Sequence, residues 1–388
     1  MQRRAFLGAV TGGLVAAPLA AEAQQAGKVH RVGVVLEGGP YYAGIDGLRA
    51  GLKELGFEEG KQYVLHIRDV KGDLSAVAET AKNLEQEKVD VIYALAASVT
   101  LEVRRGTANV PVVFHAGGDL VGSGLIESFA KPGGRFTGVN TRLVDLNAKR
   151  LEIFKEAVPK VRRALAFYDP GNSAVLENVQ VVREAARQLR IELVERHVRT
   201  VDELRAGLRE LKAGEADGIF LVGDAMVSSQ SQLIVDTART KKLPTMFYER
   251  TAVIAGGLAS YGVNSYAVGR LAAKYVHRVL LGTSPAELPV ERFDRLELVI
   301  NLKTARALGL TIPPSLLARA DEVIQGAGGD PKPNPSNPTP PRLVPGLRRA
   351  VRTLNEEERM RTVLAMTMAA FLVAGTLSVA SAADEKRE

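Results

Sequence analysis

The feature of this sequence that most constrains the fold is a regular alternation of short apolar runs with amphipathic stretches, from Val29 to about residue 325. Apolar runs of about four to eight residues bounded by turn residues indicate buried strands, and apolar residues spaced three or four apart indicate helices. Strands that alternate with helices are typical of parallel sheets covered by helices on both faces. The sequence therefore predicts an α/β fold.

The alternation falls into two halves, which predicts two Rossmann-like lobes with parallel sheets. The strands predicted for the first half are 29–37, 61–70, 89–96, 111–117 and 136–142. The second half has predicted strands at 162–170, 191–198, 217–225 and 244–250, and helices at 145–157, 173–190, 202–213 and 228–241. We expect lobe 1 over residues 28–142, lobe 2 over 143–262, and elements shared between the lobes over 263–325, with part of 265–325 returning to lobe 1.

Two such lobes predict a clamshell with a binding cleft, because ligands of open parallel sheets bind beyond the carboxyl ends of the strands. Segments 136–145 and 259–268 lead from strands of one half into helices of the other, so we expect them to cross between the lobes and act as hinges. Strand 61–70 alternates polar and apolar residues, which places it nearer the edge of its sheet.

Residues 1–23 have the order of an export signal: Arg3-Arg4, an uncharged apolar stretch, and the small-x-small sequence Ala21-Glu22-Ala23. The arginine pair resembles a twin-arginine signal, although Gln2 and Gly8 depart from the usual flanking residues, so the export pathway stays open. We expect cleavage near Ala23 and a mature body in the periplasm, without stable membrane insertion.

The C-terminal part departs from the α/β rhythm. Residues 326–346 are rich in Pro, Gly and Asn, which predicts a disordered linker. Residues 347–388 contain an uncharged segment, 362–383, preceded by Met360-Arg361 and ending near a small-x-small site. This order favours a foreign tail, the start of another exported protein joined in frame, while a membrane anchor or an extra packed helix remain as alternatives.

Composition and motifs exclude several classes of function. The chain has no cysteine, so thiolate chemistry, disulfides and zinc–cysteine sites are excluded. Residues 24–326 carry 40 basic and 36 acidic side chains, a net +4 without a basic run, which argues against nucleic-acid binding. Neither a Walker sequence nor a G-x-S-x-G or H-E-x-x-H motif occurs, and the five histidines are dispersed. We therefore predict no enzyme activity, no metal and no cofactor.

Polar residues that follow the predicted strands are the candidate ligand-binding groups. They are Ser98 and Thr100, Gly118 and Asp119, Asn172 and Ser173, and Asp224. Ser98 lies where the free N–H groups of a helix start favour an anion, and Asp224 offers a carboxylate for an ammonium group, so the two together would suit an amino-acid zwitterion. Helix capping is the structural alternative for Ser98, Asp119, Asn172 and Ser173.

Four tyrosines are the candidate aromatic groups of the cleft. Tyr41 and Tyr42 follow the first strand, Tyr248 lies in the predicted strand 244–250, and Tyr261 lies in "SYGVN". Glu249, next to Tyr248, is a further candidate to line the cleft. Aromatic side chains commonly line pockets for small organic ligands, although packing in the core is the alternative. His115 is expected to be a packed residue at a strand end.

Five stretches carry a resemblance to a known family. They are "GLRAGLKELGF" (47–57), "GDLVGSGLIESFAKPGGRFTGVN" (118–140), "KRLEIFKEAVPKVRRALAFYDPGN" (149–172), "GGLASYGVN" (256–264) and "ELVINLKTARALGLTIPPSLLARADEVIQ" (297–325). In these the sequence resembles the exported substrate-binding proteins of ABC transporters, in the tryptophan/tyrosine-type group with the type I periplasmic-binding fold.

The resemblance implies a protein that captures a small organic solute by lobe closure and delivers it to an ABC permease in the inner membrane. At the family level, aromatic or branched amino acids are the expected solutes. A periplasmic sensing subunit that signals to a membrane receptor needs the same closing clamshell, so the sequence leaves this alternative open.

Overall fold

The fold was determined from a computed structural model, which describes residues 28–141 and 143–325. The predicted export signal at 1–23, the linker at 326–346 and the tail at 347–388 lie outside these residues. No helix within 28–141 or 143–325 is both long and apolar enough to cross a membrane.

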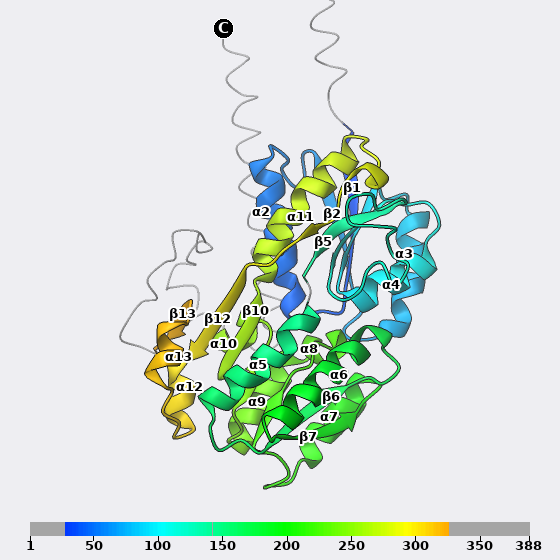
Figure 1. The fold of residues 1–388 in the computed structure, drawn as a ribbon. Coiled ribbons are helices and arrows are strands. Elements are labelled where there is room, and N and C mark those ends of the chain that lie inside the picture. The colour runs from blue at the N-terminus through cyan, green and yellow to red at the C-terminus, as the bar shows by residue number, and fades with distance from the viewer. Residues whose placement is uncertain (1–27, 142, 326–388) are drawn as a thin grey trace, which may run out of the picture. The chain divides into compact units, whose positions relative to one another are not determined.

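The first sheet lies in the upper half of Figure 1, and all its strand pairs are parallel. In spatial order it contains β11 (Glu291–Arg292), β5 (Phe136–Asn140), β4 (Val112–Ala116), β3 (Val91–Leu95), β1 (His30–Leu36) and β2 (Tyr63–Asp69). The strands β3, β4 and β5 are buried along their whole length, whereas β2 is half-buried at the edge. The alternation of residues 61–70 had predicted this edge position.

Helices cover both faces of the first sheet in two packed pairs (Figure 1). One pair is α2 (Tyr42–Glu54) with α11 (Ser265–Leu280), and the other is α3 (Val77–Gln86) with α4 (Ala97–Gly106). The first pair packs so closely that a Cβ at Gly47 would lie 1.9 Å from the carbonyl oxygen of Tyr266. Only glycine allows this approach of two backbones.

The second sheet is mostly parallel. In spatial order it contains β13 (Glu322–Ile324), β12 (Leu296–Asn301), β10 (Ala259–Val263), β9 (Thr245–Phe247), β8 (Gly218–Phe220), β6 (Arg163–Tyr168) and β7 (Glu192–His197). The pair β10 and β12 is antiparallel and is the exception to the predicted parallel arrangement among the described strands. The strand β12 enters directly from β11 of the other sheet, without the crossover helix that a parallel neighbour requires.

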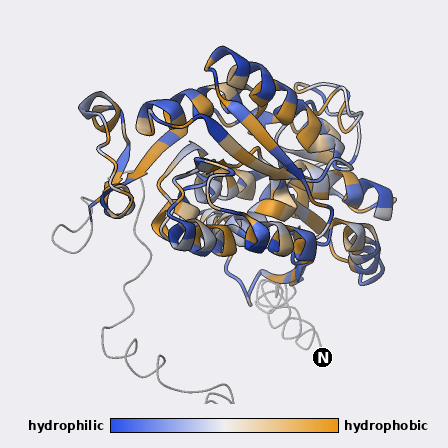
Figure 2. Ribbon diagram, turned by 90° about the horizontal axis from the view of Figure 1, so that it is seen from below, coloured by the Kyte–Doolittle hydropathy of each residue, from blue (hydrophilic) through white to orange (hydrophobic). Residues whose placement is uncertain are grey.

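Eight helices accompany the second sheet among the described residues. They are α5 (Leu143–Ala157), α6 (Ser173–Gln188), α7 (Val201–Glu210), α8 (Ala225–Ser229), α9 (Ser231–Lys241), α10 (Arg250–Ile254), α12 (Leu302–Ala307) and α13 (Pro314–Ala318). Figure 2 shows hydrophilic and hydrophobic residues alternating along the helices. In α7, for example, the buried residues are Leu204 and Leu208, one turn apart on the face toward the sheet.

The chain passes three times from one sheet to the other. It crosses between β5 and α5, between β10 and α11, and between β11 and β12. The first two crossings fall within the segments expected from the sequence, 136–145 and 259–268. The third, at 292–296, was not predicted, because β11 has only two residues and gives no apolar run.

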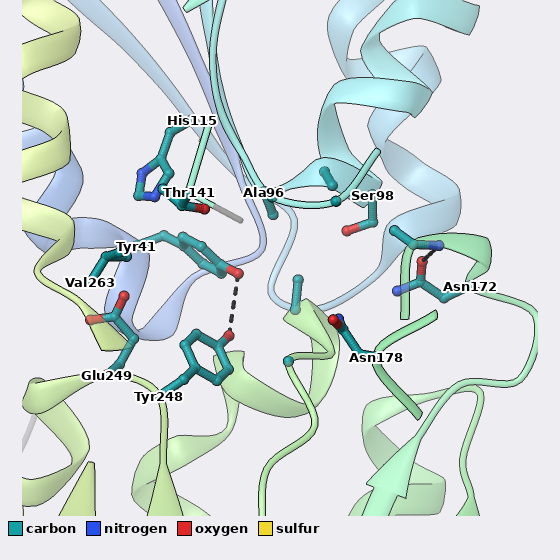
Figure 3. Close-up of a pocket in the computed structure, with 16 residues that line it drawn as sticks. Tyr41, Ala96, Ser98, His115, Thr141, Asn172, Asn178, Tyr248, Glu249 and Val263 are labelled. Carbon is teal, nitrogen blue, oxygen red and sulfur yellow. Dashed lines mark hydrogen bonds between the residues drawn. The ribbon is translucent and has the colours of Figure 1, made fainter. Parts of the chain in front are cut away.

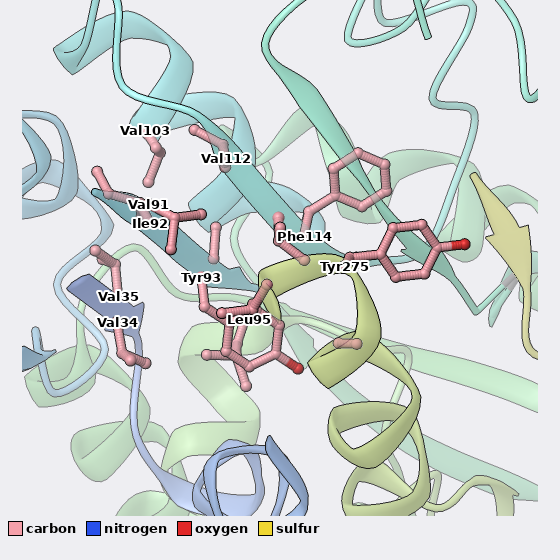
Figure 4. Close-up of a cluster of buried hydrophobic side chains, with 14 of the residues drawn as sticks. Val34, Val35, Val91, Ile92, Tyr93, Leu95, Val103, Val112, Phe114 and Tyr275 are labelled. Atoms are coloured by element: carbon pink, nitrogen blue, oxygen red, sulfur yellow. The ribbon is translucent and has the colours of Figure 1, made fainter. Parts of the chain in front are cut away.

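Each sheet has its own hydrophobic core. In the first, Val103 of α4 lies near Val91 and Val112, and Tyr275 of α11 lies beside Phe114 (Figure 4). In the second, Phe154 of α5 packs at 0% exposure near Phe220 of β8. Separate cores allow the two lobes to move as bodies about the three crossings.

Candidate ligand-binding cleft

A pocket lies between the two lobes, at the carboxyl ends of the parallel strands. Its lining comprises Tyr41, Ala96, Ala97, Ser98, His115, Gly117, Gly118 and Thr141 from the first lobe, Asn172, Ala174, Asn178, Gly223, Ala225, Tyr248 and Glu249 from the second, and Val263 at a crossing. The cavity measures about 40 Å³. A second cavity of about 270 Å³ shares Ser98 and Asn172 with the first and is also lined by Arg104, Arg105 and Ser173.

One end of the pocket is formed by helix starts. The pocket-lining residues Ala97 and Ser98 begin α4, Asn172 and Ala174 begin α6, and Ala225 begins α8. Free backbone N–H groups and the positive ends of the α4 and α6 dipoles favour a negatively charged ligand group here. Figure 3 shows Ser98, Asn172 and Asn178 at this end, and His115, Val263 and Glu249 at the other.

Two tyrosines meet across the pocket. The hydroxyl of Tyr41, from the 3-10 turn Gly39–Tyr41, lies 3.3 Å from the hydroxyl of Tyr248, which follows β9 (Figure 3). Tyr248 donates to Ser228 Oγ at 2.6 Å, so it accepts the hydrogen bond from Tyr41. Burial raises the pKa of both phenols, which keeps them neutral. The pair joins the lobes by a neutral hydrogen bond in the middle of the cleft.

Among the described residues, Glu249 is the one carboxyl side chain in the pocket lining. Ser265 Oγ donates to Glu249 Oε1, and Oε2 has no hydrogen-bond partner among the described residues. Burial raises the pKa of Glu249 to about 8, with a further rise from the charge of Glu297, so the carboxyl is largely protonated at neutral pH. An ammonium group beside it would supply the missing partner and favour its ionised form.

His115 lies at the same end of the pocket as Glu249 (Figure 3) and is neutral. Burial lowers the pKa of His115 to about 4, and its ring meets the Tyr41 ring edge-on at 6.4 Å. Its Nδ1 has no partner among the described residues. The histidine thus lines the pocket itself, rather than only packing at the strand end as expected.

A second buried carboxyl lies behind the pocket wall. Ser98 Oγ donates to Glu37 Oε1 at 3.1 Å, and Glu37 is 1% exposed at the end of β1. Burial, assisted by the nearby charge of Asp224, raises the pKa of Glu37 to about 8. Glu37 therefore orients Ser98 without lining the pocket.

The structure brings together five of the eleven residues that the sequence singled out. These are Tyr41, Ser98, Gly118, Asn172 and Tyr248. Ser173 lines the second cavity, and Asn172 also caps α6 by accepting from Ala174 N at 3.1 Å.

The other five predicted residues lie outside the pocket lining, and four of them already have local partners. Thr100 donates to the carbonyl oxygen of Ala96, the N-cap residue of α4, and Asp119 accepts from Gly122 N. Tyr42 is 43% exposed, and its hydroxyl donates to Asp69. Tyr261 lies half-buried in β10. Asp224 caps α8 and accepts from Val227 N and Asp169 N, both at 3.1 Å, so its oxygens are engaged by backbone groups.

Thr141 and Asn178 are polar lining residues that the sequence analysis did not single out, and a sequence signal exists for Asn178. Asn178 lies on the buried face of α6 with Val175, Val179 and Val182, at helical spacing. A single amide among valines on a buried helix face is a sequence signal, since buried polar groups need a partner. The small lining residues Ala96, Gly117 and Gly223 give no such signal.

The family model for ABC transporter substrate binding proteins matches residues 30–324. A curated relative, the "Tyrosine-binding protein" of Clostridioides difficile (strain R20291), is 27% identical over 260 residues, which cover 67% of this chain and 74% of the relative.

Two solved structures have a similar sequence identity to this chain. A conserved domain protein from Vibrio cholerae is 28% identical with a TM-score of 0.70, covering 77% of this chain and 100% of that one. The ABC domain from Streptococcus pneumonia in complex with L-Trp is 27% identical with a TM-score of 0.69, covering 76% and 100%. The chain thus belongs to the substrate-binding proteins of ABC transporters, which have the type I two-lobed fold and bind solutes rather than catalyse reactions.

Proposed function

We propose that the protein captures an aromatic L-amino acid in the cleft and delivers it to an ABC importer. The observation that carries this proposal is that both lobes line one pocket, with Tyr41 from the first and Tyr248 from the second meeting inside it. A ligand can drive lobe closure only if it binds the closed form better, which requires contacts to both lobes. The tyrosine-binding and L-Trp-bound relatives support the class of solute.

The polarity of the pocket supports a zwitterion. We assign the ligand ammonium to the end with Glu249, whose Oε2 lacks a partner among the described residues. We assign the carboxylate to the end where α4 and α6 begin. The sequence had suggested Asp224 for the ammonium, but Glu249 is the better candidate because the oxygens of Asp224 already cap a helix.

The ligand must replace the contact between the two tyrosines. A cavity of about 40 Å³ holds only a few water molecules, since one water needs roughly 10–15 Å³ of such space. An aromatic amino acid therefore requires the lobes to open and close again around it, with Tyr41 and Tyr248 against its ring instead of each other. The second cavity, next to Ser98 and Asn172, offers a polar approach to this end of the cleft.

Export and delivery complete the proposal. The signal-like residues 1–23 support a periplasmic location. The family supports an inner-membrane ABC permease as the partner that receives the closed, loaded form.

Isothermal titration calorimetry of the purified protein against the proteinogenic amino acids tests the proposal. We expect L-tryptophan or L-tyrosine to bind with micromolar or tighter affinity, and their D-enantiomers to bind at least tenfold more weakly. Binding should also reduce the radius of gyration in solution scattering if the free protein opens. Absence of binding by every aromatic amino acid would overturn the proposal.

A further inference from the structure

A buried arginine lies behind the wall of the pocket. Arg150 of α5 is 0% exposed, and its guanidinium lies 5.4 Å from the ring centres of both Phe220 and Tyr248. Its Nη2 donates to Leu221 O at 3.1 Å and to Asn147 Oδ1. Burial lowers the pKa of Arg150 to about 10, so the side chain is still a cation at neutral pH. A positive charge is therefore held just behind Tyr248.

This arginine fixes the direction of a chain of hydrogen bonds. A guanidinium only donates, so the amide of Asn147 must turn its oxygen toward Arg150. The Asn147 amide nitrogen then faces Asn178 and donates to its Oδ1 at 2.9 Å. With its oxygen engaged in this way, Asn178 must turn its own amide nitrogen, Nδ2, away from Asn147. The donor-only character of Arg150 thus determines the orientation of the Asn178 amide, which is the second amide along this chain of hydrogen bonds.

The Asn178 nitrogen faces the pocket. Asn178 is 4% exposed and lines the cavity, and Figure 3 shows its side chain pointing into it. A Cβ at the pocket-lining Gly223 would lie 3.3 Å from Asn178 Nδ2, so this nitrogen is located directly at the wall. No described residue accepts a hydrogen bond from it. A donor at the pocket wall that has no acceptor among the described residues is available to donate to a bound ligand.

We propose that Asn178 Nδ2 donates a hydrogen bond to the ligand carboxylate, and that Arg150 and Asn147 are positioning residues that hold this donor toward the pocket. The inference rests on the proposed function and names the group that recognises the carboxylate. A carboxylate is favoured over a neutral acceptor because α4 and α6 begin at this end of the pocket, and because the arginine cation lies behind Tyr248 in the pocket wall.

The test compares ligands with and without a carboxylate. L-Tryptophan and tryptamine are titrated calorimetrically into the wild-type protein and into N178A and N178D. A hydrogen bond to a charged group predicts that N178A weakens L-tryptophan binding about 10- to 150-fold and changes tryptamine binding less than threefold. N178D places an acceptor against the carboxylate, so its loss for L-tryptophan should be larger still.

The positioning role is tested by R150K against R150M. Lysine is also a donor-only cation and should keep most of the preference for L-tryptophan over tryptamine. Methionine removes the donor, so the two amides can turn over, and this preference should fall at least fivefold. The preference, unlike the melting temperature, does not change when a variant merely loses stability. Equal preferences in wild type, R150K and R150M would overturn the positioning role.

The outcomes separate this inference from the proposed function. The wild type could bind L-tryptophan while N178A weakens L-tryptophan and tryptamine equally, or weakens neither of them. In either case the carboxylate assignment is wrong and the amino-acid proposal stands. If the wild type binds no amino acid, acetate is titrated while the NMR signal of the Asn178 side-chain amide, identified by its absence in N178A, is followed. A saturable shift would support the donor role alone, and no shift would overturn it.

Discussion

The protonation of Glu249 predicts that ligand binding releases a proton. In the ligand-free protein the pKa of Glu249 is about 8, so about ten protonated carboxyls exist for each ionised one at pH 7. An ammonium ligand binds the ionised form, because Oε2, which has no partner among residues 28–141 and 143–325, then accepts a charged hydrogen bond. We therefore expect about 0.9 protons to be released per ligand at pH 7.

The raised pKa of Glu249 also determines how strongly the ligand affinity depends on pH. The ionised fraction of a carboxyl with a pKa of about 8 rises from about 1% at pH 6 to about 50% at pH 8. The association constant should therefore increase about 50-fold over this range, which corresponds to about 2.3 kcal/mol. The free energy of unfolding depends on pH with the opposite sign. Because the pKa of Glu249 in the folded, ligand-free protein is raised above the ordinary 4.5, this group contributes stability at low pH, and the contribution is lost as the pH rises through about 8.

Calorimetry in buffers of different ionisation enthalpy measures the released proton, and titrations from pH 6 to pH 8 measure the affinity. The variant E249Q should release no proton, bind more weakly at pH 8, and lose the pH dependence. The matched control is E37Q, because Glu37 has the same raised pKa of about 8 but lies outside the pocket lining. Proton release near zero in the wild type, or unchanged in E249Q, would refute the reasoning.

Three further predictions concern closure and stability. A Cβ at Gly72 would lie 2.7 Å from Cγ2 of Val201 in the other lobe, so G72V should hold the lobes apart and weaken amino-acid binding at least tenfold by calorimetry. Its control G60V has the same left-handed backbone, with φ +86° against +85°, but nothing within 4 Å of the new Cβ, and should retain the affinity. F154A removes a fully buried ring from the second core and should lower the free energy of unfolding by about 3–5 kcal/mol in urea titrations, with unchanged m-value. Y248F keeps the ring but removes two hydrogen bonds, and should reduce stability by about 1–2 kcal/mol in the same assay.

The α/β fold with two lobes followed from local sequence patterns and is confirmed. Strand His30–Leu36 and helix Ser173–Gln188 lie where apolar runs and helical spacing predicted them, because these patterns depend on neighbours a few residues apart. The antiparallel pair of β10 and β12 and the crossing at 292–296 were not predicted. The antiparallel pairing was missed because strand direction depends on which strands become neighbours after long connections. The crossing was missed because β11 has only two residues and therefore shows no periodicity in the sequence.

For the cleft, the sequence by itself determined which strand ends would meet ligand, since parallel strands turn their carboxyl ends to one edge. Ser98 and Asn172 follow from this rule, and both line the pocket. It did not determine which carboxyl faces the cavity. Asp224 turns inward to cap its own helix, whereas Glu249 lines the pocket with an oxygen that has no partner among the described residues.

The tertiary structure alone decided the polarity of the wall. The direction of the Asn178 amide depends on Asn147 and Arg150, which lie 31 and 28 positions away in sequence on a neighbouring helix. A local pattern can identify Asn178 as a polar residue on a buried face, but not whether its oxygen or its nitrogen meets a ligand. That choice arises only when α5 packs on α6 and the donor-only guanidinium sets the direction of the hydrogen bonds between them.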